Sequence, residues 1–282
     1  MDKKITSAMQ REENGTIRLT ITIPTMDVKK TWEEVIVEAV NNAEIQGFRK
    51  GKAPRKLVEE KLNKEKIREE VLRKLLPIAY TQAIKTQGIR PIINPKIHIE
   101  KIDDLSDGKD WQFIALTCET PEIKLGKYKE NIQKVTAKSK IAIPGKEPLP
   151  AKFEDIVKAL LDSITCQVPA ILVDNETDRL LSQTLEDVKK LGLTLDQYLA
   201  STGKNPEILR SEYKNKAEND IKLEFSLLKI AEEEKITVED KEIDEAIKAS
   251  KTDDERKNLE KNRYLLASIL RQQKTLDFLK NL

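Results

Sequence analysis

Aromatic residues are scarce in this sequence, at 4% of 282 residues, and glycine occurs only 9 times. So few glycines argue against a β-barrel or a β-sandwich, because the many tight turns of those folds use glycine. The only cysteines, Cys118 and Cys166, are too few and too far apart for a disulfide framework or a metal site. We interpret both as small core residues and the single histidine, His98, as a surface residue, and we expect no metal and no cofactor.

Long apolar runs are also absent from the sequence. No stretch approaches the roughly 20 apolar residues of a membrane-spanning helix. The first residues lack the apolar run of about 7–15 residues that a secretory signal contains. The phosphate-binding loop, the dinucleotide-binding glycine motif, the zinc-protease motif and the hydrolase serine motif are all missing. These absences predict a cytoplasmic protein that does not bind a membrane, is not an enzyme and has no catalytic residues.

Charged residues are plentiful, at 35% of the chain, and they are unevenly distributed. Residues 1–150 contain 29 Lys and Arg against 22 Asp and Glu, a net charge of +7. Residues 151–282 contain 22 against 27, a net charge of −5. A basic half beside an acidic half suits a protein with a docking end and a separate working end.

Residues 1–120 carry the patterns of a mixed domain. Ile17, Leu19, Ile21 and Ile23 alternate with polar residues and predict a half-buried strand over 16–23, with a short partner strand at about 4–9. Further patterns predict helices over residues 27–47, 55–62 and 64–87 and a hairpin of strands over 96–102 and 111–119, turning at Asp107 and Gly108. In the 64–87 helix we expect Ile67, Val71, Leu75, Ile78, Ala79 and Ile84 to face inward. We therefore predict an α+β domain with a small antiparallel sheet.

Residues 121–150 differ in composition from their surroundings. Pro121, Pro144, Pro148 and Pro150 stand among lysine-rich polar residues. Because proline restricts the residue before it to extended conformations, we predict a mostly extended linker here.

Residues 151–282 predict an elongated, all-α domain. Leucine, isoleucine and valine recur at helical spacing in several segments, each bounded by proline, glycine or a capping residue. Thr194 with Gln197 and Thr237 with Asp240 predict two helix starts. The last segment predicts a single helix over 253–281, with Ile269 on its inward side.

The stretch from Gly47 to Pro54 is the most distinctive in the chain. Its sequence is Gly-Phe-Arg-Lys-Gly-Lys-Ala-Pro, and the basic residues in and just after it are Arg49, Lys50, Lys52, Arg55 and Lys56. Two glycines, Gly47 and Gly51, flank the Phe-Arg-Lys triplet, and Pro54 precedes the next helical pattern, which together predict a tight loop between two helices. One interpretation is that the loop holds Phe48 and several cations in solvent. The residues alone equally allow a solvated basic loop with Phe48 packed back onto its own helices.

This stretch resembles the ribosome-binding signature of the trigger factor family, Gly-Phe-Arg-x-Gly-x-x-Pro, at every fixed position. Members of that family are bacterial chaperones that dock beside the nascent-chain exit tunnel. Val168-Pro169 with Leu172, and later Ile236-Thr237-Val238, also follow the family pattern and order. The family commonly carries an FKBP-like prolyl isomerase domain of about 100 residues between its terminal domains. Residues 121–150 leave no room for that domain.

The resemblance implies an ATP-independent chaperone that docks at the ribosome and holds unfolded polypeptides in an apolar helical crevice. It implies three regions: 1–120 for ribosome binding, 121–150 as a linker and 151–282 as the chaperone domain. Its partners would be the large ribosomal subunit, through the exit-tunnel protein and ribosomal RNA, and nascent or unfolded chains; a homodimer is left open. The implied ribosome-binding residues are Gly47, Phe48, Arg49, Lys50, Gly51, Lys52 and Pro54, and our candidates for client binding are Tyr198, Leu199 and Tyr264.

Two other functions compete with this interpretation. An RNA-binding or ribosome-assembly factor would also use the basic loop, but the acidic helical half does not fit that role. A SurA-like periplasmic chaperone would share the helical domain. The absence of a signal pattern and the intact loop argue against it.

Overall fold

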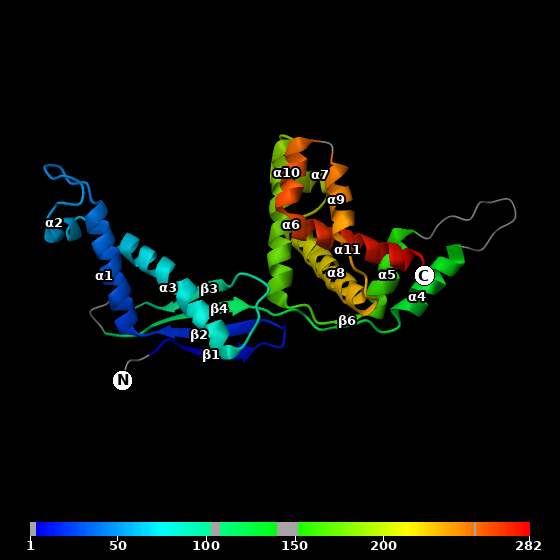
Figure 1. The fold of residues 1–282 in the computed structure, drawn as a ribbon, viewed down its shortest axis with the longest axis horizontal. Helices are drawn as coiled ribbons and strands as arrows, with labels where there is room; N and C mark the ends of the chain where they lie inside the picture. Colours follow the sequence, from blue (N-terminus) through cyan, green and yellow to red (C-terminus); the bar gives the residue numbers. More distant parts are fainter. Residues whose placement is uncertain (1–3, 103–107, 140–151, 251) are drawn as a thin grey trace. The chain divides into compact units, whose positions relative to one another are not determined.

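The computed structural model describes residues 4–102, 108–139, 152–250 and 252–282. The chain divides into two compact units, Met1–Thr120 and Pro121–Leu282. The first unit is built around one hydrophobic core and the second around several, and Figure 1 labels most of the helices and strands that form them.

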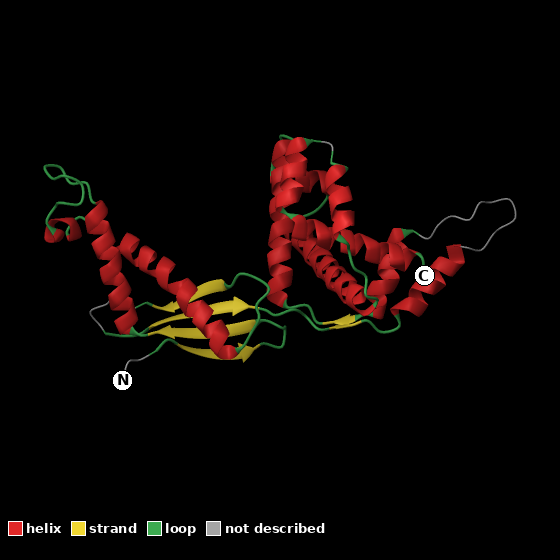
Figure 2. Ribbon diagram, viewed as in Figure 1, coloured by secondary structure: helices red, strands yellow, loops and turns green. Residues whose placement is uncertain are grey.

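A four-stranded antiparallel sheet forms the base of the first unit (Figure 2). Its strand order is β1 (Thr6–Arg11), β2 (Ile17–Ile23), β4 (Trp111–Thr117) and β3 (Lys96–Lys101). The alternation of β2 is as predicted, because Ile17, Leu19, Ile21 and Ile23 are all at most 1% exposed. The predicted partner strand and hairpin are both confirmed by the pairing. Of the expected turn, Asp107 lies outside the described residues.

Three helices follow β2: α1 (Thr25–Asn42), α2 (Arg55–Glu59) and α3 (Lys64–Gln87). Apolar residues of α1 and α3 pack on the sheet and form one core with Trp111, Phe113 and Ala115 of β4. In α3 the buried residues recur every four positions: Ile67, Val71, Leu75, Ala79 and Ala83. The expected inward position of Ile78 is wrong: its neighbour Ala79 faces the core, and Ile78 is 59% exposed.

The second unit begins with β5 (Ile123–Lys124) and α4 (Tyr128–Ser139), followed by α5 (Phe153–Ser163) and β6 (Thr165–Cys166). The two short strands pair with each other. The predicted extended linker is therefore wrong over Tyr128–Ser139, which form a helix, while residues 140–150 lie outside the described residues. Tyr128 and Ile132 of α4 are buried in a core with Leu160 of α5 and Ile230. The prediction failed because Tyr128, Ile132 and Val135 form an apolar stripe at helical spacing, which the surrounding lysines and prolines obscured.

Helices make up most of the second unit, as predicted (Figure 2). The remaining elements are α6 (Ala170–Lys190), α7 (Leu195–Thr202), α8 (Pro206–Glu233), α9 (Asp240–Lys248), α10 (Asp253–Lys261) and α11 (Arg263–Lys280). α6 and α8 share a core built around Val173, Leu180, Ala217 and Ile221. A smaller core joins α9, α10 and α11 around Ile243, Ile247 and Leu266.

Two predicted helix boundaries in this unit need correction. The single helix expected over 253–281 is interrupted at Asn262, whose backbone leaves the helical region at φ −113° and ψ 34°. The side-chain amide of Asn262 donates to the Asn258 side chain at 2.8 Å. The start expected from Thr237 and Asp240 is also displaced, because Glu239 is the N-cap of α9 and Glu242 is its capping-box partner. The capping box of Thr194 and Gln197 is confirmed.

Candidate functional site

The connection from α1 to α2, residues 43–54, contains the stretch singled out in the sequence; we call its residues 47–54 the basic loop. It lies at the end of α1 that points away from the sheet (Figure 1). Gly47 and Gly51 have φ values of +90° and +71°, the left-handed region that the sequence predicted for them. The Gly51 amide donates to the Ala43 carbonyl at 3.1 Å, and the Lys52 amide donates to the Arg49 carbonyl at 2.9 Å. The backbone of the basic loop is therefore held by hydrogen bonds within the connection between α1 and α2.

Close packing against α1 also favours glycine at position 51. A Cβ atom at this position would lie 2.5 Å from the backbone oxygen of Asn41, the residue before the end of α1. A Cβ at Gly47 would meet nothing within 4 Å. The close approach of Gly51 to α1 thus fixes how the basic loop turns back along the helix.

Replacing Gly51 by alanine is expected to open the loop, whereas Gly47→Ala serves as the matched control. Both variants carry the cost of a left-handed non-glycine residue, roughly 1–2 kcal/mol. Only Gly51→Ala adds a clash with a backbone atom and breaks the bond to Ala43. Amide hydrogen exchange at positions 51 and 52 should therefore rise more in Gly51→Ala than in the control. Equal exchange in the two variants would contradict the role of the close approach.

The structure brings the predicted loop residues together at one tip. Phe48 is 44% exposed, which argues against the interpretation that packs it into its own helices. Arg49, Lys50 and Lys52 are exposed beside it. Lys50 pairs with Glu44 at 3.3 Å, but both side chains remain largely in solvent, so this pair is weak. Pro54 is the N-cap of α2 and has an extended backbone, so it stands just before that helix.

Arg55 differs from the other basic residues near the basic loop. Its guanidinium forms two hydrogen bonds to the Glu33 carboxylate of α1, one of them 2.8 Å long, and a third to Glu59 at 2.5 Å. The hydrogen bond from Arg55 holds the pKa of Glu33 below its ordinary value. Arg55 remains exposed to solvent, but its hydrogen bonds also tie α2 to α1. Sequence spacing does not reveal this role, because Glu33 lies 22 residues away.

The three candidate client-binding residues have different surroundings. Tyr264, at the start of α11, is 90% exposed. Tyr198 in α7 is half-buried. Leu199 is only 6% exposed, so its expected place on an accessible surface is wrong: it lies on the inner side of its short helix.

Several exposed apolar residues of the second unit were missed by the sequence reasoning. Leu265 and Ile269 follow Tyr264 on α11 and are 59% and 52% exposed. Ile269 was expected to face inward, but the core side of α11 carries Leu266 and, one turn on, half-buried Leu270. At the end of α6, Leu191 is 75% exposed. Helical spacing did not reveal this exposure, because Leu191 and Ile269 each follow a buried residue, Val188 and Leu266, by three positions.

Within the described ranges, no helix is long and apolar enough to cross a membrane. The same residues contain no cluster of three or more histidine, cysteine or acidic side chains that could hold a metal ion.

Comparison with models of known protein families identifies the family of this chain. The family model described as bacterial trigger factor protein matches residues 5–145, and the model of the trigger factor C-terminus matches residues 145–281. This chain belongs to the trigger factor family. The two matches meet at residue 145, so a trigger factor prolyl isomerase domain does not stand between them in this chain.

Curated trigger factors match part of the chain. Those of Staphylococcus carnosus (strain TM300) and Staphylococcus aureus (strain JH9) are each 34% identical to it over 125 residues. These alignments cover 44% of this chain and 28% of each relative. The matched region therefore spans less than a third of the length of these relatives.

A solved trigger factor structure extends the comparison to the whole fold. It comes from work on promiscuous substrate recognition in the folding and assembly activities of the trigger factor chaperone. The alignment has a TM-score of 0.64 at 13% identity and covers 97% of this chain and 99% of the solved chain. The trigger factor fold, with its small antiparallel sheet and its mostly helical second part, is thus shared over nearly the full chain.

Proposed function

We propose that this trigger factor family member is a ribosome-associated, ATP-independent chaperone of the cytoplasm. In this proposal the basic loop docks on the large ribosomal subunit near the nascent-chain exit. The helical second unit holds unfolded polypeptides through its exposed apolar residues. The single observation that carries the proposal is the exposure of Phe48 among cations, on a loop whose backbone is held in place. No catalytic residue and no cofactor are needed for this function.

The docking contact combines charge with one apolar anchor. Arg49, Lys50 and Lys52 would pair with ribosomal RNA phosphates or with acidic residues of the exit-tunnel protein. Phe48 would leave water on docking, and buried aromatic anchors contribute much of the energy at such interfaces. Because pairing with phosphate releases counterions, the affinity should fall as the salt concentration rises.

Client holding would use exposed apolar residues of α11 and Leu191, the C-cap residue of α6. Leu191, Tyr264, Leu265 and Ile269 are all more than half exposed. The acidic residues Asp253 and Asp254 start α10, the helix just before α11. Exposed apolar side chains bordered by charge suit weak binding of many different unfolded chains. Such binding depends on desolvation of apolar surface, so it needs no nucleotide.

The full chain should suppress the aggregation of a chemically unfolded test protein in the absence of ATP. We expect the double substitution Tyr264→Ser with Leu265→Ser to weaken this suppression, because it removes two exposed apolar contacts. Ile78→Ser is the matched control, since Ile78 in α3 has the same 59% exposure as Leu265. Light scattering against chaperone concentration measures the effect. Absence of suppression by the unaltered chain would overturn the holding function.

A further inference from the structure

The connection between α8 and α9 has an unusual backbone. Lys235, two residues after the end of α8, has φ +55° and is the only non-glycine residue with positive φ in the described part of the chain. The Ile236 amide donates back to the Ala231 carbonyl at 2.9 Å, which closes the helix with a left-handed cap. The carbonyl groups of Ile236 and Thr237 then have no partner within a helix, so they need donors from elsewhere.

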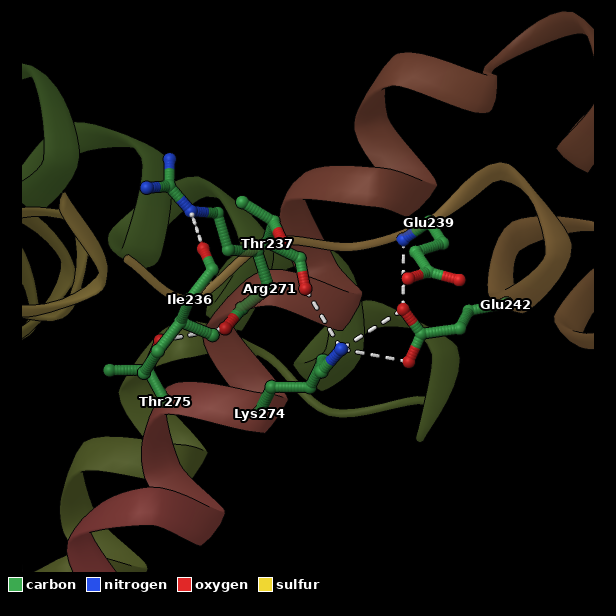
Figure 3. Close-up of polar contacts among 7 residues, drawn as sticks. All are labelled: Ile236, Thr237, Glu239, Glu242, Arg271, Lys274 and Thr275. Atoms are coloured by element: carbon green, nitrogen blue, oxygen red, sulfur yellow. Dashed lines mark hydrogen bonds and ion pairs between the residues drawn. The ribbon is translucent and has the colours of Figure 1, made fainter. Parts of the chain in front are cut away.

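Two cationic side chains of α11 supply these donors (Figure 3). Arg271 Nε donates to the Ile236 carbonyl at 2.8 Å, and Lys274 Nζ donates to the Thr237 carbonyl at 2.8 Å. The same Nζ contacts both oxygens of Glu242, at 2.8 and 2.9 Å. We call Arg271, Lys274 and Glu242 the α11 clamp.

Glu242 connects the α11 clamp to the start of α9. Its Oε2 accepts the backbone amide of Glu239, the N-cap of α9, at 2.8 Å. Hydrogen bonds from Lys274 and from this amide hold the pKa of Glu242 below its ordinary value. One carboxylate is thus shared between the first turn of α9 and the side of α11, and the helix start is fixed at the point where it touches α11.

The clamp lies where α11 passes from one core to another. Leu266, nearer its start, packs with Ile243 and Ile247 of α9. Leu279, nearer its end, packs with Ile230 of α8. Between these points, Thr275 is fully buried and its hydroxyl donates to the Arg271 carbonyl at 2.7 Å. With only three buried hydrophobic residues, the core of α9, α10 and α11 is small, and α9 is too short to be stable alone.

We propose that Arg271 and Lys274 are positioning residues that hold the start of α9 against the middle of α11. They keep α9 and α10 docked on the half of α11 that carries Tyr264, Leu265 and Ile269. The inference rests on the proposed client holding, because its functional consequence is a preformed apolar surface. If this surface became ordered only on binding, the free-energy cost of ordering it would lower the affinity for the client.

The test uses Lys274→Met in the full chain. The change removes the donors to Thr237 and Glu242 but keeps a long helix-forming side chain. We expect amide exchange over residues 236–243 to accelerate about tenfold, while exchange in the α8 core around Ile230 stays unchanged. Lys229→Met is the matched control, because Lys229 is 43% exposed against 42% for Lys274. Among the described residues, Lys229 forms an ion pair only with Glu233 of its own helix.

Two further variants separate positioning from a general loss of stability. Lys274→Arg keeps donors for the same acceptors and should restore exchange to within about twofold of the unaltered chain. Glu242→Gln retains an acceptor for the Glu239 amide but loses the charge, so it should accelerate exchange less than Lys274→Met does. If Lys274→Met unfolds the chain, Glu242→Gln and Arg271→Met provide the same local test. Exchange in Lys274→Met equal to that in Lys229→Met, or no rescue by arginine, would overturn the clamp.

The functional part of the test is aggregation suppression by the same variants. Lys274→Met should need a several-fold higher concentration than Lys229→Met to hold the same test protein, and Lys274→Arg should not. Suppression by Lys274→Met equal to the control would overturn the positioning role even if exchange accelerates. Failure of the unaltered chain to suppress aggregation would instead reject the proposed holding function. In that case the exchange measurements still decide whether the clamp exists.

Discussion

Replacing Phe48, Arg49 and Lys50 together by alanine is expected to abolish co-sedimentation with large ribosomal subunits at concentrations where the unaltered chain binds. The triple variant loses one apolar anchor and two cations from the tip of the basic loop. We expect the affinity to fall about a hundredfold or more, because truncating a central anchor and removing charge contacts each cost a large part of binding. The fold should remain intact, since all three side chains are exposed.

The same unit offers a control with the same net charge and the same classes of residue. Lys96, Ile99 and Lys101 lie on the edge strand β3 and are likewise one exposed apolar residue and two exposed cations. Their triple replacement by alanine changes the net charge by the same amount but leaves the basic loop untouched. It should reduce binding only through the general charge effect, by a few-fold. Equal losses in the two triple variants would show that net charge, not the basic loop, drives association.

Most helices and strands of the first unit could be predicted from the sequence, because their hydrophobic patterns fit only one type of secondary structure. Strict alternation from Ile17 to Ile23 requires one face of a strand to be buried. Asn63 and Gly88 fix the ends of α3, as N-cap and left-handed C-cap. The error at Ile78 arose where two adjacent apolar residues compete for one inward position. Tertiary packing decided that Ala79 occupies it.

The backbone conformation of the candidate site could be predicted from the sequence, but the contacts of its side chains were harder to predict. Glycine at 47 and 51 signals positive φ, and the structure has it at both positions. The residues alone allowed Phe48 to be either exposed or packed onto its own helices, and the structure leaves it 44% exposed. The role of Arg55 could not be predicted, because its partner Glu33 comes close only when α1 and α2 pack together. The hydrogen bond from Lys274 to the Thr237 carbonyl could not be predicted for the same reason, because 37 residues separate the donor from the acceptor.

The second large prediction concerns α4, whose residues the sequence pattern had assigned to a linker. Ile132→Ala should destabilise the second unit by about 2–5 kcal/mol, the usual cost of truncating a fully buried isoleucine. Ile132 is 0% exposed and packs with residues of α5, α8 and α11. In an extended linker the same substitution would change nothing. Lys134→Ala, at an exposed position of the same helix, is the control and should change stability by less than about 0.5 kcal/mol.

Denaturant unfolding of the full chain can measure this effect in one unit at a time. Both tryptophans, Trp32 and Trp111, belong to the first unit, so their fluorescence reports its unfolding alone. Circular dichroism at helical wavelengths is dominated by the second unit, which contains most of the helices. Ile132→Ala should move the dichroism transition to lower denaturant and leave the tryptophan transition in place. If neither transition moves, α4 is not part of the second core; if both move together, the two units unfold cooperatively as one domain.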